Sequence, residues 1–130
     1  MSHGLTLSFK AGADIGEYNV VKFDSNGNVV PATSASDQAV GVAQYEAKSG
    51  RGVAVTVIGY TKVVASGAIA AGARLKAASN GQVAAVGGEA AGSTVNVIGY
   101  AISKADAAGD IIEAVLVPSS YTVPSDSSGA

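Results

Sequence analysis

The sequence predicts a small all-β protein, a β-barrel or β-sandwich built from two similar halves that each contain a hairpin. Residues 25–30 (SNGNVV) return as residues 79–84 (SNGQVA), with apolar residues on both sides each time. The Asn-Gly pair in each copy supplies the two positive-φ positions of a type I′ turn. A longer pair of apolar segments follows each hairpin. Such repetition indicates an all-β unit made by duplication.

The first half is expected to begin with a strand at residues 5–9, where apolar and polar residues alternate as in a half-buried strand. This strand could equally act as an arm that adds to a neighbour's sheet. Residues 20–23 then fold back onto residues 29–30. Residues 39–47 and 53–58 form the longer pair, and Gly59 marks the corner at which the second of these strands bends and continues.

The second half repeats this order, with residues 75–77 paired to 83–85 and then strands near 95–103 and 111–117. After Pro118 the composition becomes rich in serine, so we expect a tail. The predicted organisation is an N-terminal arm (1–10), one β domain (11–117) with duplicated parts at about 18–59 and 72–117, and a C-terminal tail (118–130).

Composition excludes several classes of function. The chain has 130 residues and no cysteine, so disulfides, thiol catalysis and cysteine-ligated zinc are excluded. The net charge is -2 and the basic residues are scattered, which predicts no nucleic-acid binding. No run approaches the ~18 apolar residues of a membrane helix, so we expect no membrane partner and a soluble protein made in a cytoplasm.

The surface is expected to be poor in charge. Charged residues make up 14% of the chain, against about 25% in typical soluble domains. Partners are therefore expected to cover part of the surface.

No residue pattern in the chain supports catalysis, a metal site or a cofactor. His3 is the only imidazole and lies in a polar terminus with nothing to orient it. The segment that starts at Asp24 resembles a calcium loop, but Val29 stands where glycine is required and Ala35 where glutamate is required. Acidic pairs fall in exposed turns, which give no pocket to separate their pKa values. These pairs are Asp14 with Glu17 and Asp106 with Asp110.

Tyrosines are the aromatic residues best suited to an interface, because a rigid ring covers area at low entropy cost. Tyr60 and Tyr100 each follow an Ile-Gly pair, and we assign them to the core or its rim. Tyr121, in the tail, is assigned to an interface. The candidate interface residues are Leu5, Leu7, Phe9, Lys10 and Tyr121.

Several short segments, in their order along the chain, resemble those of a known family. They are residues 9–14, the Asn26-Gly27 hairpin, and residues 39–42, 59–63, 99–101 and 107–112. Together they resemble the small capsid decoration, or cement, proteins of tailed bacteriophages, over roughly residues 9–117. The resemblance implies a non-enzymatic β protein on the outer surface of the virion, with the major capsid protein as its partner. It also implies a homo-oligomer, with a trimer as the expected form, that stabilises the head against the pressure of packaged DNA.

Two other classes of protein remain open at this point. A host-surface or glycan-binding fibre module would also be all-β, although the chain has no tryptophan and its loops are mostly Ala, Gly and Ser. A carrier domain with a modified lysine would also consist of duplicated hairpins. Its lysine would stand at a hairpin tip, where this chain has Asn26-Gly27 and Asn80-Gly81.

Overall fold

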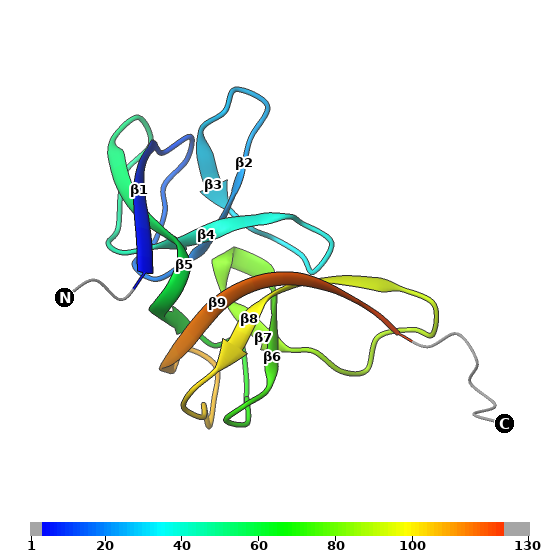
Figure 1. Ribbon diagram of the computed structural model, residues 1–130. Coiled ribbons are helices and arrows are strands. Elements are labelled where there is room, and N and C mark those ends of the chain that lie inside the picture. The colour runs from blue at the N-terminus through cyan, green and yellow to red at the C-terminus, as the bar shows by residue number, and fades with distance from the viewer. Residues whose placement is uncertain (1–3, 124–130) are drawn as a thin grey trace, which may run out of the picture.

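The computed structural model describes residues 4–123, which form one nine-stranded antiparallel sheet curled into a half-barrel (Figure 1). The predicted all-β class is confirmed. The order in the sheet is β3-β2-β4-β5-β9-β8-β6-β7, and β1 pairs with β5 off this path. The strands are β1 (Gly4–Lys10), β2 (Val20–Phe23), β3 (Val29–Pro31), β4 (Ala39–Ala43), β5 (Gly52–Val64), β6 (Arg74–Ala77), β7 (Val83–Ala85), β8 (Thr94–Ala101) and β9 (Ile111–Thr122).

The two halves repeat one another in their backbone hydrogen bonds. Ile15 and Ala47 exchange two N–H···O bonds of 2.8 and 2.9 Å in the first half, and Ile69 and Ala105 exchange two of 3.0 and 2.9 Å in the second. The ladder between β2 and β4 and the ladder between β6 and β8 also carry the same register shift. Both predicted hairpin pairings are confirmed.

Strand β5 belongs to both halves. Its first part pairs with β1 and, through Thr56 and Val55, with β4. From Gly59 onward it pairs with β9 instead. Gly59 has φ +100°, a conformation that favours glycine, so it is the corner that the sequence predicts. The chain thus passes from one half of the sheet to the other inside a single strand.

The alternating sequence of β1 predicts a half-buried strand, and this prediction is wrong because β1 is mostly exposed. Of its seven residues only Phe9 is partly buried, and the others are exposed. The strand pairs with β5 along one edge, and a register shift between Leu5 and Thr6 interrupts the alternation of faces. An edge strand with one neighbour covers little of its own surface.

The two Asn-Gly turns differ, so the type I′ prediction holds for only one of them. Asn80 and Gly81 both have positive φ, 58° and 74°. In the first hairpin Gly27 has φ 82° but Asn26 is not left-handed. There the carboxylate of Asp24 accepts hydrogen bonds from the N–H groups of Asn26 and Asn28, at 2.8 and 3.0 Å. These bonds stabilise a turn that needs one left-handed residue instead of two.

The interior contains two hydrophobic clusters of small and β-branched side chains. One lies within the first half, around Val21, Val29 and Val55. The larger cluster includes Leu75 and Leu116 and spans both halves. The largest fully buried side chains are these two leucines, valines and a threonine, as expected from a chain with few aromatic residues. Among residues 4–123, no helix is long and apolar enough to cross a membrane.

Candidate interaction surface

An exposed apolar surface lies on the outside of the sheet, over β5, β9 and β8. Along β9 the side chains of Ile112, Ala114 and Leu116 are buried, so the alternate residues point outward. Tyr60, Val115 and Tyr100 are register partners on three adjacent strands and therefore share this outward side.

We call this surface the outer face. It carries six large apolar side chains, each between 38% and 54% exposed: Leu5, Ile58, Tyr60, Tyr100, Ile111 and Val117. Leu5 joins the set because it lies opposite Ile58 in the β1–β5 ladder. Single exposed apolar residues are ordinary, but a contiguous group of this kind is typical of an interaction site.

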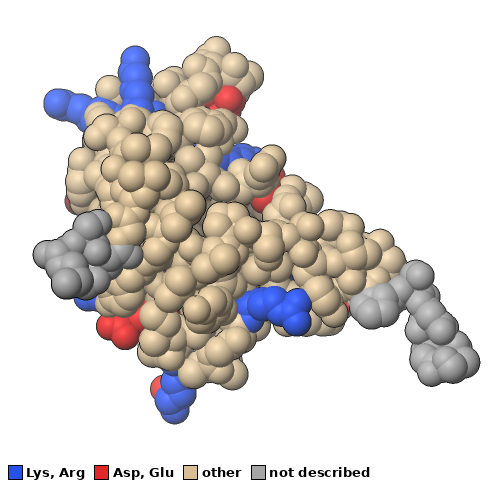
Figure 2. All heavy atoms as spheres, in the orientation of Figure 1, with Lys and Arg blue, Asp and Glu red and all other residues tan. Residues whose placement is uncertain are grey.

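The outer face has few charges. Lys62 and Glu113 lie opposite one another within it, and Arg74 lies opposite Tyr100 at its border. The Tyr60 hydroxyl donates a 2.8 Å hydrogen bond to Glu113 Oε2, which raises the pKa of Tyr60 because ionisation would place two negative charges together. Figure 2 shows one side of the molecule, on which charged side chains are sparse and lie mostly toward the margin.

A second candidate site is a cleft of about 300 Å³ lined mainly by residues of β4, β8 and β9. We call it the β4–β9 cleft. Its lining contains no charged residue: it is formed by Val20, Val57, Leu116, Pro118, residues 38–42, residues 96–98 and residues 119–120. The polar groups in the lining are amides and hydroxyls. The cleft can therefore accommodate an uncharged ligand that also forms hydrogen bonds.

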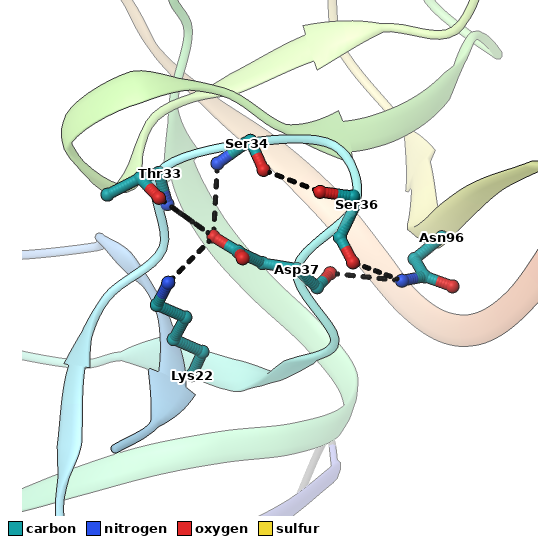
Figure 3. A network of polar contacts seen from close by, with 6 residues as sticks. All are labelled: Lys22, Thr33, Ser34, Ser36, Asp37 and Asn96. Carbon is teal, nitrogen blue, oxygen red and sulfur yellow. Dashed lines mark hydrogen bonds and ion pairs between the residues drawn. The ribbon is translucent and has the colours of Figure 1, made fainter. Parts of the chain in front are cut away.

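The loop before β4 is held rigidly by a carboxylate. Asp37 Oδ2 accepts hydrogen bonds from the N–H groups of Thr33 and Ser34, at 2.8 and 3.1 Å, and pairs with Lys22 Nζ at 3.1 Å (Figure 3). These contacts, led by the Thr33 N–H, lower the pKa of Asp37 to about 2. The Asn96 side chain on β8 donates to the carbonyls of Ser36 and Asp37, at 3.0 and 3.3 Å, and ties this loop to the other half.

The structure does not gather the five predicted interface residues into one site. Leu5 lies on the outer face, whereas Leu7 lies opposite the buried Val55, and Lys10 is exposed at the end of β1. The Phe9 ring packs edge-on against Phe23, with 5.5 Å between ring centroids. The Tyr121 ring lies 4.4 Å from the Arg74 guanidinium. Tyr121 is thus engaged within its own chain.

The sequence assigns Tyr60 and Tyr100 to the core or its rim, and it does not indicate that they lie together. In the structure both are half-exposed members of the outer face. One signal was available, because Ile111, Val115 and Val117 make β9 apolar on the side opposite its buried residues. A strand with two apolar sides indicates that both are covered in the working state.

No group of three or more His, Asp or Glu side chains among residues 4–123 could hold a metal ion. His3 lies outside the described residues.

Comparison with known proteins finds a matching family and a similar fold. A family model described as phage cement protein matches residues 1–118. The fold is similar to a crystal structure of the head fiber gp8.5 N base of bacteriophage phi29, with a TM-score of 0.66 and 18% identity. That alignment covers 87% of this chain and 93% of the other. No curated protein sequence matches significantly.

Proposed function

The chain belongs to the phage cement protein family, and from this premise we propose that it binds the outer surface of an assembled phage head and stabilises it against internal DNA pressure. Membership makes it a structural protein of the virion that associates with the head. The observation that carries the proposal is the extent of the family match, over residues 1–118 of 130. The proposed partner is the major capsid protein.

Physical considerations agree with this role. A protein that binds the assembled lattice and not the free subunits shifts the equilibrium toward the lattice by mass action. The outer face and the β4–β9 cleft offer two separate surfaces that are poor in charge. Two surfaces allow one molecule to contact two neighbours at once, as a clamp across a seam requires.

We assign the outer face to contacts between copies of this chain, in a homo-oligomer for which a trimer is the proposed form. Interfaces between identical subunits are more apolar than the rest of a protein surface, and the outer face has this character. Tyr100→Ser should therefore reduce the oligomer seen by sedimentation velocity. Tyr45→Ser is the matched control, since Tyr45 is 48% exposed against 44% for Tyr100 and lies outside this face. Equal oligomerisation of the two variants would contradict the assignment.

Strand β1 remains a proposed contact with the head through Leu7 and Lys10, and Tyr121 is proposed to line a contact at the other end of the molecule. One edge of β1 pairs with β5, and on the opposite edge residues 5–10 have no ladder partner among the described residues. Such an edge can accept a strand from a partner. Deleting residues 1–10 would also uncover β5, so Leu7→Ser is the cleaner test, with reduced head binding and an unchanged Tm expected.

The primary test is co-sedimentation of the purified protein with heads assembled from the major capsid protein of the same genome, both unexpanded and expanded. Saturable binding to the expanded heads is expected, and decorated heads should survive heating that opens bare heads. Absence of binding to either form would contradict the proposal and favour a fibre module that binds glycans or the host surface. A glycan screen would then be the next experiment.

A further inference from the structure

The internal repeat makes it possible to compare the edge of β4 in the first half with the corresponding edge of β8 in the second. Ala39 in β4 pairs with Lys22, and Val97 in β8 pairs with Lys76, so these two residues occupy corresponding places. On its other side Val97 pairs with Ser119, and the ladder continues from there to Thr94 with Thr122. The second half therefore has a strand, the end of β9, beside this edge.

The same edge in the first half lacks such a strand. β4 pairs with β5 only at Val42 and Ala43. From Gly59 onward β5 pairs with β9, so β5 cannot cover β4 as β9 covers β8. Residues 39–41 thus have no ladder partner on this side among residues 4–123. Unpaired edges of this kind are templates for an added strand.

This bare edge is one wall of the β4–β9 cleft. The opposite wall is β9 itself, which has no ladder partner on its β5 side beyond Leu116 within the described part of the chain. Val57 and Ile98 are also part of the apolar lining. The cleft thus combines main-chain groups that can form a ladder with an apolar surface for alternate side chains, which are the two requirements for strand addition.

We propose that the β4–β9 cleft receives an extended, uncharged segment of the major capsid protein, which adds as a strand beside residues 39–41. The inference rests on the proposed function, because it names the surface through which the head is bound. The uncharged lining excludes a charged segment, since a charge placed there would have no partner. The cleft volume of about 300 Å³ limits the inserted part to a few residues with small side chains.

The cleft is formed in advance of binding. The bonds from Asn96 to Ser36 and Asp37 fix the loop that leads into β4, and Asp37 is held by Thr33 and Lys22 (Figure 3). A rigid edge loses little conformational entropy when a strand adds to it.

The first test fills the cleft without disturbing the core. Ser119 is exposed and lines the cleft, so Ser119→Trp places a large ring where the segment would lie. Ser49→Trp is the matched control, at an exposed turn outside the cleft. Ser119→Trp should weaken binding to expanded heads by about tenfold or more, while Ser49→Trp binds as the unmodified protein does. Circular dichroism and the Tm should show both variants folded.

The possible results separate the inference from the proposed function. If Ser119→Trp binds heads as well as Ser49→Trp, the cleft inference is overturned while the cement function stands. If the unmodified protein does not bind heads, both are overturned. If Ser119→Trp changes the oligomer size in the absence of heads, the cleft holds a second copy of this chain, and the inference is again wrong.

Hydrogen–deuterium exchange provides an independent readout on the unmodified protein. Amides of residues 38–41 and of Ser119 and Ser120 should exchange more slowly on decorated expanded heads than in the free protein, because an added strand gives them hydrogen-bond partners. Unchanged exchange at residues 38–41 on saturated heads would overturn the proposal.

Discussion

The two halves of the molecule share a hydrogen-bond framework and differ in what covers it. In the second half the end of β9 lies along β8, whereas in the first half the matching edge of β4 is bare and borders a cleft. The halves also differ at one left-handed position. Tyr18 and Gly72 both have positive φ and donate equivalent N–H bonds, to Ala43 and Ala101. Non-glycine residues in this conformation are strained and cluster at functional sites.

The comparison locates the parts of the duplicated fold at which the two halves differ. The backbone hydrogen bonds between Ile15 and Ala47 in the first half have exact counterparts between Ile69 and Ala105 in the second. The positions that differ surround the β4 edge and the boundary between the halves, where Tyr18 packs against the larger hydrophobic cluster. The first half has therefore retained an open edge that the second half closes with its own chain.

The largest effect is expected from adding one carbon to the glycines at equivalent places in β4 and β8. A Cβ on Gly41 would lie 2.2 Å from the Thr56 carbonyl oxygen, and one on Gly99 would lie 1.9 Å from that of Val115. Because these are backbone atoms of a paired strand, Gly41→Ala and Gly99→Ala should each cost about 3 kcal/mol or more. Denaturant unfolding measures this, with Gly67→Ala as the control, since no atom lies within 4 Å of its added Cβ.

If either glycine tolerates alanine as Gly67 does, the two halves are not equivalent at this contact.

A smaller effect is expected at the carboxylate that holds the first loop. The pKa of Asp37 is lowered from 3.8 to about 2, and solvent screening of this partly exposed group reduces what the shift contributes, so Asp37→Asn should cost about 1 to 2 kcal/mol at pH 7. The group is charged in both the folded and the unfolded state above about pH 5, and this stability is lost as the pH falls through 4 to about 2. Glu89→Gln is the counterpart in the second half, where the pKa of Glu89 is lowered by its contact with Lys76.

Urea unfolding of both variants at pH 7 and at pH 3 measures these costs. A loss for Asp37→Asn no greater than that for Glu89→Gln would show that the two loops are held equally firmly.

The smallest effect concerns the hairpin turns. Asp24→Ala removes the acceptor for the Asn26 and Asn28 N–H groups and should cost about 1 kcal/mol. Asp24→Asn keeps an acceptor oxygen and should cost less than half of that. Thermal unfolding distinguishes the two variants, and equal losses would mean that the carboxylate does not determine the turn.

Much of the fold was predictable because local pattern and tertiary structure agree. Both hairpin pairings and the corner at Gly59 follow from apolar runs and glycine placement. The conformation of the turn at Asn26 could not be predicted, because the Asp24 carboxylate accepts hydrogen bonds from the N–H groups of Asn26 and Asn28. The sequence predicts that the last strand ends at Val117, yet β9 continues to Thr122. The β8–β9 ladder skips residues 117 and 118, so no ladder bond is lost at the proline.

The candidate surfaces were harder to predict than the fold. The outer face joins residues from three strands, and only their pairing shows that Tyr60 and Tyr100 lie in one row. The cleft depends on β5 leaving β4 in order to pair with β9, which no local sequence pattern expresses.

The most direct measurement is a cryo-EM reconstruction of expanded heads decorated with the unmodified protein. We expect this protein on the outer surface of the shell, with an extended segment of the major capsid protein beside residues 39–41 in the β4–β9 cleft. A decorated head in which that cleft contains no peptide would contradict the proposed mode of attachment. A head that carries no protein on its outer surface would contradict the cement function itself.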